Sequence, residues 1–230
     1  ARRLGERVGR ELGIPVYLYE QAATSPERRN LADIRVGEYE GLASKLAQPE
    51  WKPDFGPARH NPRSGAYIIG AREFLIAYNV NVATTDKRYA DDIAYTLRER
   101  GRHKRGGNVV PFYYKGEVVV FGEDRFPCGA CDHVAKSWDA LAVHYLDAHD
   151  RDLAARYAAL DYPAEAVAGR PVYADGRFPH VKAVGWVVDK YRRAQISINL
   201  TDFKVTPAHA VLEAAREEAA LRGIAVTGSE

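Results

Sequence analysis

The chain has 230 residues, 46% of them hydrophobic, so it can bury a sizeable core and does not have the composition of a disordered protein. The net charge of +2 is nearly balanced and creates no whole-protein field that would favour nucleic acid or an anionic membrane. No apolar run approaches the length of a membrane span, so we expect no membrane partner.

A helix is predicted over residues 2–12, where an apolar stripe recurs. Leu4, Val8 and Leu12 are spaced four residues apart and therefore share one helical face. Gly13 follows and suits the left-handed residue that ends many helices.

A short buried strand is predicted next, over residues 14–19, because this run is rich in apolar and aromatic residues. Residues 25–50 are charged and partly helical. A loop over residues 53–65 then contains enough proline and glycine to fix its backbone without regular hydrogen bonds. The anchors expected within 25–50 are Ile34, Tyr39, Leu42 and Leu46.

The rest of the chain alternates between strand and helix patterns. The predicted elements are a strand over 74–82, a helix over 86–100, a hairpin over 109–121, two strands over 181–203, a helix opened by Thr206-Pro207 and closed by Gly223, and a strand from Ile224. When a central insert over about 103–178 is left out, the order is strand, helix, strand, strand, helix, strand. We therefore predict the α+β fold class, with a ferredoxin-like βαββαβ sandwich.

The insert contains a motif with the spacing of a zinc site. Two cysteines on a tight turn and two histidines on one helical face would surround a single ion, and the chain has no other cysteine. Phe126, Trp138 and Leu141 would supply a small core that needs the metal for stability. The alternative is two free thiols and two surface histidines. The predicted ligands are Cys128, Cys131, His144 and His149.

This zinc module is predicted to be structural and not to bind nucleic acid. Between its first and last ligand, Lys136 is the only Lys or Arg, against Asp132, Asp139 and Asp147. Phosphates would repel such a helix. Four protein ligands also leave no open position for catalysis. Using both cysteines on a metal is typical of a reduced cytoplasmic chain.

Two predicted strands carry neutral hydrogen-bonding side chains on one face. Such groups suit a ligand with many donors and acceptors, although an ordinary wet face or a buried polar interface is the alternative. The candidate substrate-facing residues are Asn79, Asn81, Gln195, Ser197 and Asn199.

The rigid loop and the basic run at 98–105 are further candidate sites. Arg59, His60 and Arg63 would place cations on a fixed backbone, which suits a carboxylate or a pteridine, whereas a plain surface loop is the alternative. The basic run would attract a polyanionic tail, or it is simply a solvated helix end.

Long ordered stretches resemble the glutamate formiminotransferase family. The matching stretches are 12–20, 34–41, 51–57, 70–81, 183–186, 194–200 and 226–230, which leave about 103–178 as an insert. The resemblance implies two α/β subdomains with a folate site between them. Residues 1–71 would be the C-terminal part of the first subdomain, and residues 72–230 the second.

The resemblance also implies a reaction and a set of binding residues. The formimino group of N-formimino-L-glutamate would pass to tetrahydrofolate, the cosubstrate, in histidine degradation, and Zn²⁺ would be structural. The residues placed in the folate-binding stretch are Gly56, Pro57, Ala58, Arg59, His60, Asn61, Pro62, Arg63, Ser64 and Gly65.

The chain departs from the family pattern at its ends. The family's catalytic histidine lies in a His-Pro-Arg segment expected upstream of residue 1, so we assign no catalytic residue and expect a fragment that is inactive alone. We expect small-molecule partners and a cytoplasmic location, and a homodimer is compatible with the sequence. A zinc-stabilised binding module without enzymatic activity, or a formyltransferase that uses N-formylglutamate, are the alternatives.

Overall fold

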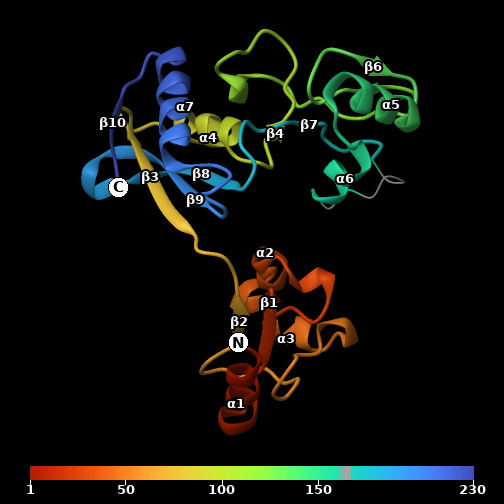
Figure 1. The fold of residues 1–230 in the computed structure, drawn as a ribbon, viewed down its shortest axis with the longest axis vertical. Coiled ribbons are helices and arrows are strands. Elements are labelled where there is room, and N and C mark those ends of the chain that lie inside the picture. Colours follow the sequence, from red (N-terminus) through yellow and green to blue (C-terminus); the bar gives the residue numbers. More distant parts are fainter. Residues whose placement is uncertain (161, 163–166) are drawn as a thin grey trace. The chain divides into compact units, whose positions relative to one another are not determined.

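The computed structural model describes residues 1–160, 162 and 167–230, which form two compact units, Ala1–Glu73 and Phe74–Glu230 (Figure 1). The protein is a mixed α/β chain with several small sheets, in agreement with the predicted α+β class. No described helix has both the length and the apolar character that crossing a membrane requires.

The first unit is built around two parallel strands. β1 (Val16–Glu20) pairs with β2 (Tyr67–Ala71), so the predicted buried strand is present and gains a partner that the sequence pattern did not reveal. The helices of this unit are α1 (Arg2–Leu12), α2 (Leu31–Arg35) and α3 (Glu38–Leu46), and two short 3₁₀ turns lie at Pro26–Arg28 and Pro49–Trp51.

Helix α1 has the predicted length but buries a different face. Leu4 and Leu12 are 56% and 61% exposed, whereas Gly5 and Gly9 are the buried residues. A Cβ atom on Gly9 would lie 2.5 Å from the backbone nitrogen of Gly56, so the helix approaches its neighbour through glycines. Of the predicted apolar stripe, only Val8 packs against the core of this unit, and Leu4 and Leu12 do not.

The second unit contains a four-stranded sheet in the order β10-β3-β9-β8, and every neighbouring pair is antiparallel. Along the chain, α4 connects β3 to β8 and α7 connects β9 to β10. The bounds are β3 (Ile76–Val82), α4 (Lys87–Leu97), β8 (Val181–Val188), β9 (Arg193–Leu200), α7 (Ala208–Leu221) and β10 (Val226–Ser229).

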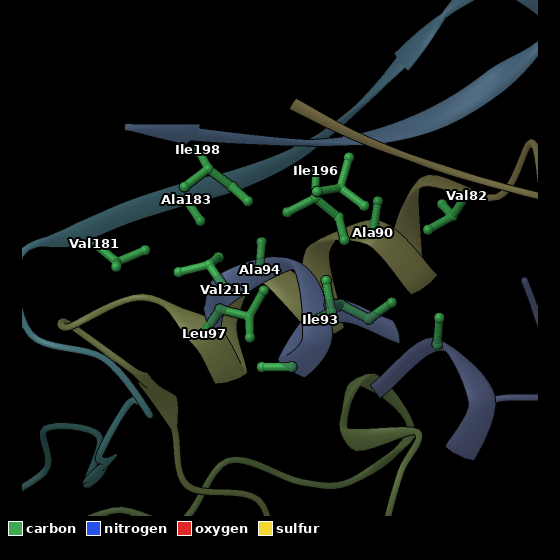
Figure 2. Packing of buried hydrophobic residues seen from close by; sticks show 14 of the residues in the cluster. Val82, Ala90, Ile93, Ala94, Leu97, Val181, Ala183, Ile196, Ile198 and Val211 are labelled. Carbon is green, nitrogen blue, oxygen red and sulfur yellow. The ribbon is translucent and has the colours of Figure 1, made fainter. Parts of the chain in front are cut away.

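The core of the second unit lies between the sheet and helices α4 and α7. Figure 2 shows Ile196 and Ile198 of the sheet facing Ile93 and Leu97 of α4 and Val211 of α7. All five side chains are buried. Because side chains alternate along a strand, the residues that neighbour these buried ones point to the opposite face of the sheet.

Two helix ends differ from their predictions. Helix α4 ends at Leu97 rather than near residue 100, because Arg98 is already extended. Helix α7 has Pro207 at its N-cap, and the Thr206 hydroxyl donates to the carbonyl oxygen of Pro179 instead of capping the helix.

The insert folds around a core of its own, formed by residues such as Phe121, Leu141 and Tyr157. The predicted hairpin over 109–121 is wrong, because Val120 bridges Pro171 and Val118 bridges Arg105 instead. Residues 161 and 163–166 of the predicted insert lie outside the described residues. The elements are β4 (Arg102–His103), the 3₁₀ turn Tyr113–Lys115, β5 (Phe126–Pro127), β6 (Val134–Ala135), α5 (Trp138–His149), α6 (Leu153–Ala158) and β7 (Tyr173–Ala174).

Candidate functional site

The loop over residues 56–65 begins at a glycine that no other residue could replace without movement. Gly56 has a φ of 80°, and a Cβ atom there would lie 2.2 Å from the carbonyl oxygen of Ile14. The loop therefore starts in close contact with the backbone that leads into β1. This supports the prediction of a conformationally restricted segment.

Hydrogen bonds within the loop fix its second half. The Asn61 side-chain oxygen accepts from the backbone nitrogens of Arg63 and Ser64 at 3.0 and 3.2 Å. The Asn61 carbonyl accepts from Gly65 N at 2.8 Å, and the Tyr39 hydroxyl donates to the Pro62 carbonyl at 2.8 Å. Local turn chemistry and one tyrosine of α3 therefore hold this segment.

Two polar atoms of the loop are buried without a hydrogen-bond partner among the described residues. They are Nε2 of His60 and Oγ of Ser64. The His60 ring packs edge-on against Tyr39, with 5.1 Å between the ring centroids. Buried polar atoms are normally paired, so these two mark a position where a ligand could supply the missing bonds.

A cavity of about 300 Å³ opens beside the end of the loop. Ser64 and Gly65 line it, together with aromatic and apolar side chains such as Tyr17, Tyr39 and Leu42. This combination of apolar walls and few polar groups is typical of small-molecule sites. Sequence analysis treated Tyr39 as a core anchor, whereas the structure places it half-exposed between loop and cavity.

The cations of the loop point to solvent. Arg59 and Arg63 are exposed, and neither forms an ion pair with any carboxylate of the described residues. They are available to an anionic ligand, but their positions are not fixed by side-chain contacts.

The polar strand residues lie together on the sheet of the second unit. In the β3–β9 register, Asn79 is opposite Ser197, and Asn81 is opposite Gln195. Asn199 is opposite Ala77 on the same face. The structure therefore brings all five predicted substrate-facing residues onto one surface of two adjacent strands.

Gln195 differs from its neighbours because it is only 2% exposed. Its side-chain nitrogen donates to Asn81 Oδ1 at 2.9 Å and to Glu230 Oε1 at 2.7 Å, and its oxygen accepts from Trp186 Nε1 at 2.5 Å. Gln195 thus organises the face rather than presenting a free amide. The sequence analysis missed Trp186, although strand alternation puts it on the face opposite the buried Gly185.

The predicted metal ligands converge on one point, and we call them the Cys/His cluster. One ligand atom from each residue lies within 4.8 Å of all the others. The Cys128 sulfur is 3.5 Å from Nε2 of His149, and the Cys131 sulfur is 3.2 Å from Nε2 of His144. The cluster consists of Cys128, Cys131, His144 and His149.

A β-hairpin and a helix position these four side chains. The cysteines lie on the turn between β5 and β6, where backbone nitrogens of Ala130 and His133 lie 3.4 and 3.5 Å from the two sulfurs. Both histidines lie on α5, which Ser137 caps by accepting from Ala140 N. Burial raises the pKa of the Cys128 thiol and so disfavours the thiolate, and a bound cation would offset this effect.

Lys104 was missed by the sequence analysis. Its Nζ donates to the carbonyl oxygens of Cys128 and Cys131 at 2.8 and 2.5 Å. Its place within a basic run pointed to solvated charge or a polyanion, and gave no signal for a contact with the cysteine turn.

Comparison with known proteins gives two matches to domain families. Residues 1–72 match the formiminotransferase domain, N-terminal subdomain, and residues 148–230 match the formiminotransferase domain. Residues 73–147, which contain three members of the Cys/His cluster, lie outside both matches.

Individual relatives carry related names. A formimidoyltransferase-cyclodeaminase of Dictyostelium discoideum is 34% identical over 230 residues, 100% of this chain and 30% of that protein. The mouse protein of that name is 35% identical over the same coverage. A glutamate formimidoyltransferase of Streptococcus pyogenes serotype M1 is 45% identical over 125 residues, 54% of this chain and 39% of that protein. The chain thus spans less than half the length of these relatives.

Proposed function

Because the chain belongs to the formiminotransferase family over residues 1–72 and 148–230, we propose that it forms part of an enzyme that transfers a formimino group from N-formimino-L-glutamate to tetrahydrofolate. The family membership agrees with the resemblance seen in the sequence. The names of the relatives support the type of reaction, and the sites described above support the binding of its substrates.

The folate site is proposed to lie on the loop over residues 56–65. The observation that carries this proposal is the pair of unpartnered buried atoms, His60 Nε2 and Ser64 Oγ, with Ser64 lining the 300 Å³ cavity. A pteridine ring has a flat apolar body and several donors and acceptors at its edge. In the cavity it could stack against an aromatic wall while its edge bonds Ser64 Oγ, and His60 Nε2 is the second unpartnered atom of the same loop.

The second substrate is proposed to use the polar face of β3 and β9. Asn79, Ser197 and Asn199 carry neutral groups that can bond a polar amino-acid derivative, and their desolvation is less costly than that of charged groups. Gln195 would hold this face in shape through its bonds to Asn81 and Trp186. We assign no catalytic base to the described residues.

Binding of a stable reduced folate, such as 5-formyltetrahydrofolate, to the chain tests the folate proposal by calorimetry. Ser64→Ala should weaken binding about five- to tenfold, the effect of one lost hydrogen bond. Ser44→Ala, on an exposed position of α3, should leave the affinity unchanged. Absence of binding by the unmodified chain, or equal binding by both variants, would count against the proposed site.

A formyltransferase on the same scaffold would bind folate equally well, so the donor must be tested separately. Binding of N-formimino-L-glutamate and N-formyl-L-glutamate to the folate-loaded chain can be compared directly. Tighter binding of the formimino compound supports the proposed reaction, and tighter binding of the formyl compound supports the alternative. Asn79→Ala should weaken binding of the preferred compound.

The Cys/His cluster is proposed to hold a structural zinc ion. A tetrahedral zinc with bonds of about 2.3 Å to sulfur and about 2.0 Å to nitrogen separates these atoms by about 3.5 Å. The separations of 3.5 and 3.2 Å within the cluster fit this geometry. When bound, zinc would link the cysteine turn to α5 and stabilise the insert.

Metal analysis of two histidine variants tests this proposal. His144→Ala removes a ligand and should lower the zinc content well below one ion per chain. His133→Ala is the matched control, because His133 stacks on His144 with 3.9 Å between centroids but is not in the cluster. A metal-free folded protein, or equal zinc content in both variants, would contradict the site.

The finer fold assignment is also a proposal. We propose that the second unit is a ferredoxin-like sandwich with a zinc-finger-like insert. Its support is the sheet order β10-β3-β9-β8 with helices α4 and α7 as the two crossovers. The insert begins at β4, directly after α4, and returns through β7 to β8. It therefore interrupts a connection and leaves the strand order of the sheet intact.

A further inference from the structure

A second cavity, of about 460 Å³, lies in the second unit where α4 meets the strands of the insert. Its lining is dominated by guanidinium groups and tyrosine rings rather than by the neutral groups of the sheet face. We call it the arginine cavity. The residues that define it here are Arg98, Arg100, Arg102, His103, Arg105 and Tyr173.

Each acidic residue that lines the arginine cavity forms an ion pair, and Oδ2 of Asp92 is buried without a hydrogen-bond partner among the described residues. Asp91 forms an ion pair with Lys87 at 2.5 Å, and Asp92 forms one with Arg102 at 3.1 Å. Arg88 also lines the cavity, which brings the number of lining arginines to five, against two carboxylates. The lining carries an excess of positive charge.

Three of these arginines have no ion-pair partner among the described residues, namely Arg98, Arg100 and Arg105. Their contacts are with neutral groups. Arg98 Nε donates to the Gly101 carbonyl at 2.8 Å, and Arg105 Nη1 donates to the Gly116 carbonyl at 3.0 Å. Each of these two arginines therefore keeps N–H groups that could bond an anion.

The walls hold these guanidinium groups in place. Arg98 lies over the Tyr95 ring, with 4.1 Å from Cζ to the centroid. The Arg98 side chain is half-buried, which lowers the pKa of its guanidinium, whereas Arg100 is exposed. Arg100 and His103 both contact the Tyr173 hydroxyl, at 3.5 and 3.0 Å. A fixed and partly dehydrated cation such as Arg98 binds an anion more strongly than a mobile surface cation does.

We propose that the arginine cavity binds a small anion with two or more phosphate or carboxylate groups. The planar guanidinium matches both groups, and three cations without ion-pair partners favour a multiply charged ligand over a single carboxylate. The volume falls within the range of small-molecule sites. No residue of the 56–65 loop lines this cavity, so the proposal is independent of the folate site.

Calorimetric titration of the full chain with pyrophosphate, citrate and acetate tests the proposal. Pyrophosphate or citrate should bind with 1:1 stoichiometry, acetate should bind at least tenfold more weakly, and raising the ionic strength should weaken the binding. Saturation by pyrophosphate alone identifies a phosphate site, and saturation by citrate alone a carboxylate site. If neither saturates the protein, or if acetate binds equally well, the proposal is wrong.

Arginine variants locate the site. Arg98→Gln should weaken binding about tenfold or more, the effect of a lost charge-assisted hydrogen bond. Arg98→Lys keeps the charge but loses the planar fork, so its effect should be intermediate. Arg193→Gln, an exposed position at the start of β9, should bind like the unmodified chain. Circular dichroism verifies folding, and unchanged affinity in a folded Arg98→Gln variant would place the anion elsewhere and overturn the proposal.

Discussion

Lys104 Nζ lies 2.8 Å from the carbonyl oxygen of Cys128, so the segment that lines the arginine cavity is bonded to the turn that carries both cluster sulfurs. The contact is polar and charge-assisted on the donor side. Residues that orient metal ligands affect affinity even though they do not touch the ion.

Replacing this lysine should therefore weaken metal binding. Lys104→Met keeps an unbranched side chain one atom shorter and removes the donor, and we expect zinc affinity to fall about 10- to 100-fold. Competition with a chromophoric chelator measures the change. Lys136→Met makes the same substitution at an exposed position of the module and should have no effect. Equal affinities of the two variants would show that Lys104 does not position the cysteine turn.

Local features of the structure could be predicted from the sequence. The Cys/His cluster depends on spacing within one hairpin and one helix, and Gly13 adopts the left-handed conformation expected at the end of α1, with a φ of 63°. The alternation in β9 also placed Ser197 on the same side as Gln195. Such features are encoded within a few residues of each other.

Features that depend on distant residues could not be predicted in this way. Val120 pairs with Pro171 across about fifty residues, which is why a local hairpin was wrongly predicted there. The sequence pattern of α1 places Leu4 and Leu12 on its apolar stripe, but close packing of the backbone buries Gly9 on another face. Burial of Gln195 likewise depends on Trp186 from another strand.

The packing of α1 can be tested with a single methyl group. In Gly9→Ala, the new Cβ atom would lie 2.5 Å from Gly56 N and 2.8 Å from Phe55 Cβ, so the helix must move. We expect the free energy of unfolding to fall by about 1–3 kcal/mol in urea titrations, despite the higher helix propensity of alanine. Folate binding should also weaken, because Gly56 begins the proposed loop.

Gly41→Ala is the matched control for this substitution. Gly41 lies inside α3, and a Cβ atom there would have no neighbour within 4 Å. This variant should gain about 0.5–1 kcal/mol of stability. A destabilised Gly41→Ala or an unaffected Gly9→Ala would contradict the close-packing explanation.

Tyr17 should make the first unit sensitive to alkali. Burial raises the pKa of Tyr17 to about 12, and its hydroxyl donates to the Trp51 carbonyl at 2.6 Å. The unfolded chain ionises near pH 10, so stability is fully present below that pH and is lost as the pH rises towards 12. The loss should approach ~2–3 kcal/mol in urea titrations between pH 9 and 12.

Tyr17→Phe should remove this alkaline loss from the first unit while lowering its stability at pH 8 by about 1 kcal/mol, because the hydrogen bond is absent. Burial also raises the pKa values of Tyr145 and Tyr157, so the second unit should keep its own alkaline loss. Tyr67→Phe, at an exposed position of β2, should keep the loss seen in the unmodified chain. If Tyr17→Phe retains the full pH dependence, another group is responsible.

His103 should couple anion binding to proton uptake in the arginine cavity. Burial and neighbouring arginines lower the pKa of His103, so it is uncharged at neutral pH and, without a ligand, opposes folding as the pH falls through the usual histidine range. A bound anion would favour the protonated imidazole and so raise the pKa of His103. Pyrophosphate affinity should therefore rise several-fold from pH 7.5 to 5.5. Comparing the unmodified chain with His103→Gln by calorimetry cancels the titration of pyrophosphate itself, and equal pH dependence in both would exclude His103. The other charged or titratable groups of this lining are Arg88, Asp91, Asp92, Tyr95, Arg98, Arg100, Arg102, Arg105, Tyr113, Tyr114 and Tyr173.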